Sequence, residues 1–278
     1  MAEKGNFGLL QRKFRKRILE MKKELKLSVI ILTKNEEDII GDCLESVKWA
    51  PEVVVVDHYS TDQTLKIVKE HGINKIYVAD EKSSFSERRD LGAQKAQGEW
   101  LLYVDADERV TPVLRKEVEE VIKDSNFSAY AIPRRNVRLT KELHFGGWWP
   151  DYVLRLMRKD KLKTWKGDLH EQPEIEGETG YLKEALVHFS HRGSLEHKFK
   201  NTINWSKIEA QKMFDAGHPP MNVKRFVSAM FREFYKRAVK LQAFRDGTEG
   251  IIEAFYQVFS VFISYARLWE MQIESKKK

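Results

Sequence analysis

The sequence predicts an α/β fold in which a mostly parallel sheet is flanked by helices and followed by a C-terminal helical extension. Short apolar runs alternate with amphipathic helical segments between residues 27 and 123. The alternation stops beyond residue 127, and the pattern is helical from Ser194 onward. Alternating strands and helices are typical of a parallel sheet with right-handed crossovers. A chain of 278 residues is long enough for one large α/β domain and an appendage.

The expected elements follow one another along the chain. The first four strands are expected at 27–32, 53–56, 75–78 and 100–104, and the helices at 36–47, 62–71, 86–96 and 112–123. Further strands are expected at 129–132, 153–157 and 181–189. The helical C-terminal part has a break at Gly217-His218-Pro219-Pro220, and residues 1–26 have the spacing of a basic amphipathic helix.

The composition restricts the possible classes of function. The net charge of +7 favours nucleic acid, an anionic membrane surface or a phosphorylated substrate as a partner. A single cysteine excludes an intrachain disulfide framework and fits a reducing compartment. Cys43 lies in an apolar helical pattern, so we expect it to be a small core residue and not a nucleophile.

No membrane-crossing segment is expected. Residues 1–26 are charged throughout, which is unlike a secretory signal. The longest uncharged apolar stretch, 254–266, would span about 20 Å as a helix, against a hydrocarbon core of about 30 Å.

Polar and acidic residues follow three of the predicted parallel strands. Thr33-Lys34-Asn35-Glu36-Glu37 follows the first, Asp57-His58-Tyr59-Ser60-Thr61-Asp62 the second, and Asp105-Ala106-Asp107 the fourth. Open α/β folds build their ligand crevices at the carboxyl edge of the sheet. Mg²⁺ prefers oxygen ligands and completes its shell with water and substrate phosphates. The three strand ends together therefore predict a metal–diphosphate site.

A purely structural interpretation covers part of this pattern. Asn35 and Asp62 have the residue types of helix N-caps, and Asp57 could cap the next turn. We favour the cap for Asp62. For Asp57, a buried acceptor for a ligand donor, such as the ring N–H of uracil, better explains why a strand of four valines ends at an acid.

These blocks resemble the signatures of family 2 nucleotide-sugar glycosyltransferases. The matching blocks are Ser28–Glu37, Val54–Asp57 with Ser60–Thr64, and Asp105–Asp107. Later segments resemble the subgroup of the lipopolysaccharide-core glucosyltransferase that acts on heptose. They are Pro133–Asn136, Gly146–Tyr152, Leu154–Leu156, His170-Glu171 and Tyr265–Glu270. The resemblance covers about residues 27–271.

The resemblance implies a GT-A (Rossmann-like) fold with a catalytic domain at 27–193 and a helical extension at 194–278. It implies an inverting transfer from a nucleoside-diphosphate sugar, here UDP-glucose or a close relative, with Mg²⁺ or Mn²⁺. The implied donor-binding residues are Thr33, Asn35, Glu36, Asp57, Arg88, Arg89 and Asp105, and the implied metal-binding residues are Asp105, Asp107 and His188. Two alternatives stay open: Arg88 and Arg89 as a solvated helix face, and His188 as a hydrogen-bonded core histidine. The family commonly has Asn where this chain has Asp90.

The acceptor hydroxyl must lose a proton, so a carboxylate is needed on the opposite side of the sugar ring. Asp151 and Glu171 are the two candidates, and we prefer Asp151 because it ends an aromatic, glycine-rich loop. The acceptor-binding candidates are Trp148, Trp149 and His170. The alternatives are that the tryptophans belong to the core and that Asp151 is a turn acid.

The C-terminal segment combines aromatic residues with many cations, a composition of helices that lie in a membrane interface. The alternative is that its apolar face packs on the protein and only the basic face meets solvent. We expect a cytoplasmic protein, peripheral on the inner face of the cell membrane, with a saccharide or glycolipid acceptor. Two rivals are a polyprenyl-phosphate sugar transferase and, from another class, a nucleic-acid-binding protein. The sequence contains no nucleic-acid-binding motif.

Overall fold

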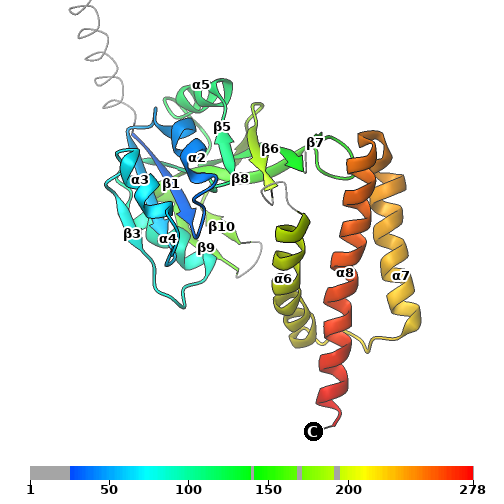
Figure 1. Cartoon of the computed structure of the whole chain (residues 1–278). Helices are drawn as coiled ribbons and strands as arrows, with labels where there is room; N and C mark the ends of the chain where they lie inside the picture. The colour runs from blue at the N-terminus through cyan, green and yellow to red at the C-terminus, as the bar shows by residue number, and fades with distance from the viewer. Residues whose placement is uncertain (1–25, 139–140, 168–170, 191–194, 278) are drawn as a thin grey trace, which may run out of the picture. The chain divides into compact units, whose positions relative to one another are not determined.

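The computed structural model describes residues 26–138, 141–167, 171–190 and 195–277, except the side chain of His197. Contacts divide the chain into two compact units (Figure 1). The first comprises residues up to 132 together with 153–186, and the second comprises 133–152 together with 187–278. The predicted helix at 1–26 falls almost entirely outside the described residues. The division of the chain into a catalytic domain at 27–193 and a helical extension at 194–278 stays a prediction.

The structure has strands and helices in the predicted alternation. The strands are β1 Leu27–Thr33, β2 Glu52–Asp57, β3 Ile76–Val78, β4 Trp100–Tyr103, β5 Glu108–Val110, β6 Ala129–Arg138, β7 Lys141–Leu143, β8 Asp151–Arg158, β9 Leu162–Lys166, β10 Gln172–Ile175, β11 Thr179–Tyr181 and β12 Leu186–Phe189. The helices are α2 Ile40–Val47, α3 Thr64–Glu70, α4 Phe85–Lys95, α5 Pro112–Val121, α6 Leu195–Asp215, α7 Val223–Phe234 and α8 Thr248–Ser275.

The first unit is built on a parallel sheet. β3, β2, β1 and β4 lie in this order and are parallel, and β8 pairs antiparallel with β4. β11 runs parallel to β6, and β9 with β10 forms a separate antiparallel pair. The predicted α/β fold with a mostly parallel sheet and C-terminal helices is confirmed.

Two expected elements differ from the observed ones, and some observed strands were not expected. The helix expected at 36–47 begins at Ile40, because residues 34–39 form the turn that carries candidate site residues. The strand expected at 181–189 is two strands, β11 and β12, separated by exposed Lys183 and Glu184. Short strands such as β5 and β7 were not expected, since three residues carry too little periodicity to be recognised.

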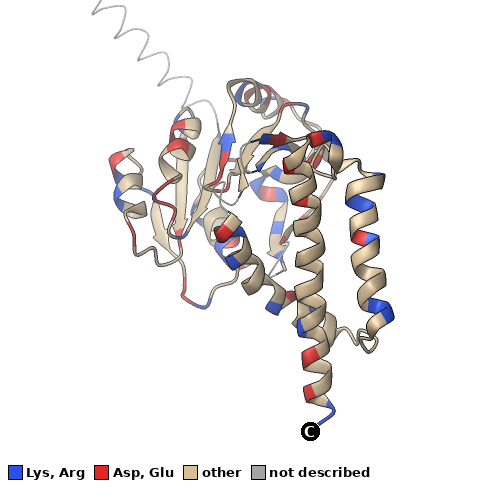
Figure 2. Cartoon of the chain, turned by 45° about the vertical axis from the view of Figure 1, so that its right-hand side comes forward, with Lys and Arg blue, Asp and Glu red and all other residues tan. Residues whose placement is uncertain are grey.

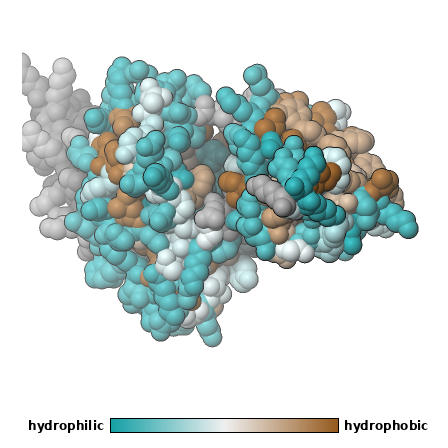
Figure 3. Space-filling model, turned by 90° about the horizontal axis from the view of Figure 1, so that it is seen from below, coloured by the Kyte–Doolittle hydropathy of each residue, from teal (hydrophilic) through white to brown (hydrophobic). Residues whose placement is uncertain are grey.

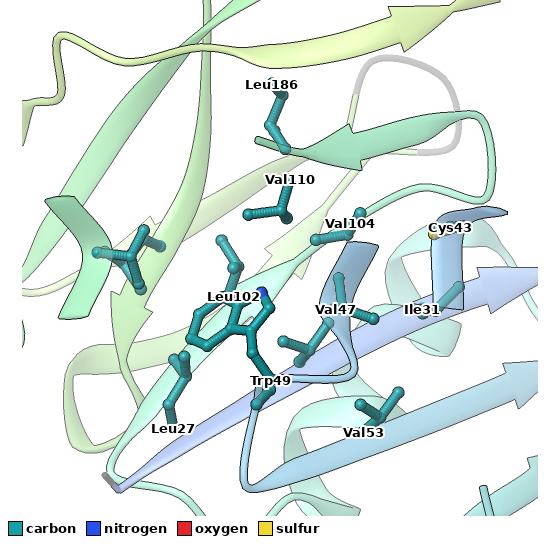
Figure 4. Close-up of a cluster of buried hydrophobic side chains, with 14 of the residues drawn as sticks. Leu27, Ile31, Cys43, Val47, Trp49, Val53, Leu102, Val104, Val110 and Leu186 are labelled. Atoms are coloured by element: carbon teal, nitrogen blue, oxygen red, sulfur yellow. The ribbon is translucent and has the colours of Figure 1, made fainter. Parts of the chain in front are cut away.

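The strand residues alternate between two apolar layers, as a sheet covered on both faces requires. Val29 and Ile31 lie in one layer, with Cys43, Leu44 and Val47 of α2 (Figure 4). Figure 4 also shows Trp49, Leu102 and Val104 in this layer. Ile30, Val54, Val56, Leu101 and Tyr103 lie in the other layer, with Ala93 of α4. Cys43 is fully buried, and burial raises the pKa of its thiol, so its predicted role in the core is confirmed.

The second unit contains α6, α7 and α8, with a π-helical stretch, Tyr235–Lys240, after α7. α8 packs against both α6 and α7. Within the described ranges, α8 is the one helix with the length and apolar composition to cross a membrane. Buried Glu253 of α8 pairs with Lys198 of α6 and lies 3.6 Å from Arg138. α8 thus contributes a buried acid to a charged cluster inside the unit. The expectation that no segment crosses a membrane stays a prediction.

Candidate functional site

The carboxyl ends of β1, β2 and β4 meet at one edge of the parallel sheet. Thr33, the last residue of β1, is in register with Asp57, the last residue of β2. On the other side of β1, Tyr103 is in register with Ile30, and Asp105 follows Tyr103 by two residues. Neighbouring strand ends thus deliver Thr33, Asp57 and Asp105 to the same edge. This is where open α/β sheets bind ligands.

Asp57 closes the turn that follows β2. Its side chain is buried, and its two oxygens accept from the Ser60 backbone N–H at 3.0 Å and from the Ser60 hydroxyl at 2.5 Å. Tyr59 adopts a left-handed conformation with φ of 57° inside this turn. The capping role that we set against ligand binding is therefore present. It leaves each carboxylate oxygen with capacity for a further donor.

The loops after β1 and β2 are joined by hydrogen bonds. Asn35 Oδ1 accepts from the Thr61 N–H at 2.8 Å, and the Asn35 N–H donates to Ser60 at 2.9 Å. Asn35 is therefore not a helix N-cap: α2 begins at Ile40, and the φ of 56° at Asn35 turns the chain. The N-cap of α3 is Gln63, so the cap favoured for Asp62 is wrong. Asp62 lies in the turn before the helix, where its carboxylate accepts from the Thr64 N–H at 3.0 Å and from the Glu37 N–H at 3.1 Å. These hydrogen bonds connect the two loops beside Thr33 and Asp57.

Thr33 places a buried hydroxyl at this edge of the sheet. Its residue is 4% exposed, and its hydroxyl has no hydrogen-bond partner among the described residues. A buried hydroxyl without a partner is costly and uncommon in native structures. At the end of a strand between Asp57 and Asp105, this hydroxyl is suited to a ligand oxygen or nitrogen.

Asp105 is held by two arginines. Arg155 of β8 donates to Asp105 Oδ2 and also to Glu108 at 3.1 Å, and Arg89 of α4 donates to Asp105 Oδ1 at 3.1 Å. Glu108 is fully buried and accepts from the Asp105 N–H at 3.0 Å, which closes the turn. Burial alone would lower the pKa of Arg155, but Asp105 and Glu108 outweigh it and raise this pKa. The position of the Asp105 carboxylate is thus fixed from two sides.

Sequence reasoning missed Arg155 and Glu108. The available signal was an acid three residues after Asp105 and a lone arginine inside the otherwise apolar centre of a strand, Leu154-Arg155-Leu156. A buried arginine needs an acidic partner, but the sequence does not say which one.

Asp107 is a half-buried acid two residues beyond Asp105. Arg109 connects the turn that contains these two acids to the start of α2. Its guanidinium donates to the Ala106 carbonyl at 2.8 Å and to the Ile39 carbonyl at 2.8 Å. The described residues contain no group of three or more His, Cys, Asp or Glu arranged around a metal. Mg²⁺ commonly takes one or two protein carboxylates together with substrate phosphates. Asp105 and Asp107 therefore fit a divalent cation that binds together with a diphosphate.

Arg89 links Asp105 to the candidate base Glu171. Arg89 donates to Glu171 Oε1 at 2.9 and 2.7 Å, and it is nearly buried, with its guanidinium 4.8 Å from the Trp165 ring. Arg88 is buried as well, with only 7% of the residue exposed, and its guanidinium lies 4.0 Å from the centre of the Phe85 ring. The alternative of a solvated helix face is therefore wrong for both arginines. Burial lowers the pKa of Arg88. His170 lies outside the described residues.

Asp151 belongs to the second unit and lies in its own network. Its Oδ2 accepts from Arg134 at 3.0 and 2.7 Å and from Asn136 Nδ2 at 3.0 Å. No donor among the described residues reaches its Oδ1, and the side chain is 26% exposed. Asp151 thus has one oxygen that is firmly positioned and one that is available to an incoming hydroxyl.

His188 is the next member of this network. Asn136 Nδ2 donates to Asp151 and to the Trp148 carbonyl at 3.1 Å, so Asn136 Oδ1 is its acceptor atom. His188 Nδ1, 2.7 Å from that oxygen, must then carry a hydrogen. In the neutral imidazole, Nε2 therefore carries the lone pair that a metal or a proton would need. The predicted metal role of His188 stays a prediction.

The two tryptophans of the 145–152 loop differ in exposure. The Arg138 guanidinium lies 3.7 Å from the centre of the Trp148 ring, and that of Arg237 lies 5.3 Å away. Trp149 is 40% exposed. A cation already covers a face of Trp148, so Trp149 is the better candidate for a sugar platform.

The Arg155 pair predicts a stability effect. Arg155→Met would leave the carboxylate of Glu108 buried without its cation, so we expect the free energy of unfolding to fall by about 3–5 kcal/mol. Arg158 lies on the same strand as Arg155 and forms an exposed ion pair with Asp160. Arg158→Ala removes this pair and is expected to lower the free energy of unfolding by less than about 1 kcal/mol. Urea denaturation of both variants measures the difference. Equal effects would mean that Arg155 is not the main counterion of Glu108.

Comparisons with known proteins show which family the chain resembles. The profile of Glycosyl transferase family 2 matches residues 28–186, which contain β1, β2, β4 and the Asp105–Asp107 step. The chain is 26% identical over 261 residues to "Lipopolysaccharide core biosynthesis glycosyltransferase LpsC" of Rhizobium meliloti, covering 89% of this chain and 93% of that protein.

Two solved structures are also similar. TarS 1–349 of S. aureus with UDP-GlcNAc has a TM-score of 0.46 at 19% identity, covering 90% of this chain and 92% of that one. Glucosyl-3-phosphoglycerate synthase of Mycobacterium tuberculosis with Mn²⁺, UDP-glucose and phosphoglyceric acid has a TM-score of 0.36 at 17% identity, covering 42% and 46%. With the family profile matching more than half of its residues, the chain belongs to glycosyltransferase family 2.

Proposed function

We propose that this glycosyltransferase moves a hexose, glucose in our reading, from a UDP-sugar to a sugar hydroxyl of a cell-envelope glycolipid or lipopolysaccharide core, with inversion. The observation that carries the proposal is the edge formed by Thr33, Asp57 and Asp105, with an unpartnered buried hydroxyl between two positioned carboxylates. The choice of acceptor class follows the relative named for lipopolysaccharide core biosynthesis, which matches along nearly its whole length.

The residues at this edge have distinct tasks in donor binding. Asp57 accepts from the base, while Thr33, Asn35 and Glu36 line the nucleoside pocket. Asp57 can do so because its turn already fixes the carboxylate in place. Nearly buried Arg88 and Arg89 supply positive charge near the diphosphate. A cation that burial has partly stripped of water interacts strongly with a phosphate.

A divalent cation, Mg²⁺ or Mn²⁺, would be held by Asp107 and Asp105. When bound, it would stabilise the negative charge that builds on the departing diphosphate. Arg89 and Arg155 orient Asp105 without the cation, so the protein positions this carboxylate before the donor arrives. Asp107 is the direct ligand in this proposal, because it is the second acid of the Asp105-Ala106-Asp107 step.

Asp151 is the proposed base, since its Oδ2 is fixed by Arg134 and Asn136 and its Oδ1 meets no described donor. Glu171 shares Arg89 with Asp105, so its role is to position the donor side of the site. Trp149 and His170 would contact the acceptor. A lipid-linked acceptor implies that the enzyme works at the cytoplasmic face of the cell membrane.

A polyprenyl-phosphate acceptor is the second candidate, because it would use the same donor edge. The two are separated by their products. Purified enzyme with UDP-glucose and Mn²⁺ is incubated with lipopolysaccharide core acceptor or with polyprenyl phosphate. We expect label in the core saccharide. Transfer to polyprenyl phosphate alone would replace the first candidate, and no stabilisation by any of a panel of nucleotide sugars in thermal-shift assays would contradict both.

Thr33→Val tests the donor edge directly. The change removes a hydroxyl that has no described partner, so the free energy of unfolding is expected to stay constant or rise. Affinity for the UDP-sugar is expected to fall about fivefold, the value of one hydrogen bond. Thr202→Val is the matched control: this hydroxyl is buried and bonded to the Lys198 carbonyl, so the protein should lose stability and keep its donor affinity. Unchanged affinity in Thr33→Val would remove Thr33 from the site.

A further inference from the structure

One face of α7 exposes apolar side chains. Val223, Val227 and Phe231 are followed at the same interval of four residues by Tyr235, the first residue of the π-helical stretch that continues α7. Their exposed fractions are 77%, 63%, 65% and 51% in chain order. Residues at this spacing lie on one side of a helix. We call these four residues the α7 stripe.

The α7 stripe is not the face with which the helix packs. Ala229 is the buried residue of α7, and Phe226 lies 6.1 Å from Phe262 of α8, between ring centres. The inward face of α7 is therefore already supplied with apolar contacts. Figure 3 shows apolar residues gathered on the surface of the helical unit. A continuous exposed apolar face on a helix marks an interaction surface.

Cations accompany the α7 stripe along its length. The residues that directly follow its four members are Lys224, Ser228, Arg232 and Lys236, which places a row of three cations and a serine beside it. Between Val223 and Arg245 the chain has seven Lys or Arg and a single acid, Glu233, which is paired with Arg237 (Figure 2). Lys224, Arg232 and Lys236 are exposed.

We propose that the α7 stripe and its cations bind the surface of an anionic phospholipid bilayer, with α7 lying in the plane of the interface. Val, Phe and Tyr at one side of a helix enter the boundary between headgroups and acyl chains, and adjacent Lys and Arg meet the phosphates. A second copy of the chain is a poor occupant, because each copy carries six unbalanced positive charges in this segment. The inference deepens the proposed function and rests on its placement of the enzyme at a membrane face, but its test does not depend on which sugar or acceptor is used.

The test uses the full chain and vesicle flotation. Vesicles of phosphatidylcholine alone are compared with vesicles that also contain phosphatidylglycerol, at low and at high salt. We expect binding to the anionic vesicles and weaker binding at high salt. Val227→Ser/Phe231→Ser is expected to lower the affinity by about tenfold or more.

The control removes equally exposed apolar residues elsewhere. Val113→Ser/Tyr181→Ser changes side chains of residues that are 52% and 67% exposed, and it should leave vesicle binding unchanged. Two results would overturn the proposal: equal loss in both double variants, or no preference for anionic vesicles. Dimerisation in sedimentation equilibrium that Phe231→Ser abolishes would also overturn it, in favour of a second copy. Thermal shift with UDP-sugar on the same samples reports donor binding separately, so the two proposals fail independently.

Discussion

Asp107→Asn is expected to lower kcat/KM for sugar transfer at least about a hundredfold, because a carboxylate ligand supplies several kcal/mol through the cation that stabilises the leaving diphosphate. The side chain is half-buried at the end of a turn that Arg109 and Glu108 hold independently, so folding should not suffer. Initial rates at a series of Mn²⁺ concentrations measure the loss, and circular dichroism checks the fold.

A nearby acid provides the control. Asp42 lies on α2, 3.8 Å from Arg109, and its side chain is 86% exposed. Asp42→Asn changes the charge close to the same turn and is expected to leave the transfer rate unchanged. If Asp107→Asn transfers sugar at the full rate, the role of this residue in metal binding is wrong. If both variants lose activity alike, the effect comes from net charge near the turn.

Asp151→Asn is expected to bind the UDP-sugar normally and to lose transfer activity by about a hundredfold to ten-thousandfold, the usual contribution of a general base. The amide of Asn can still accept from Arg134 and Asn136 through its oxygen, so the network keeps its shape. Isothermal titration with donor and single-turnover transfer measure the two effects separately.

Glu171→Gln distinguishes the two candidate bases. Glu171 shares Arg89 with Asp105, so the neutral variant removes one of the two negative charges on Arg89 and should raise the KM for the donor more than it lowers kcat. Normal donor binding with loss of transfer should therefore be the property of Asp151→Asn and not of Glu171→Gln. The reverse pattern would make Glu171 the base and leave Asp151 as a turn acid.

The orientation of α7 shows what an amphipathic pattern leaves open. The sequence shows apolar residues and cations at helical spacing in this segment, and it allows the apolar face to point inward or outward. In the structure α7 has apolar residues on both sides: Phe226 faces α8, and Val227 and Phe231 are exposed. The hydrophobic periodicity of a sequence indicates that one face of a helix is more apolar than another. Which face is buried depends on the elements that pack against the helix.

The Asp105 site divides in the same way. The sequence by itself determined that β1, β2 and β4 are parallel strands with Thr33, Asp57 and Asp105 at one edge, because apolar runs and turn residues are local signals and parallel strands end at a common edge. Only the tertiary structure decided that Arg155, fifty residues further on, holds Asp105 and buried Glu108. It also joined Asp151 to Arg134 and Asn136, and Asn136 in turn to His188. Ion pairs between charged side chains that are distant in the sequence leave no periodic pattern. They depend on which groups the fold buries together, so the charged residues are visible in the sequence but their pairing is not.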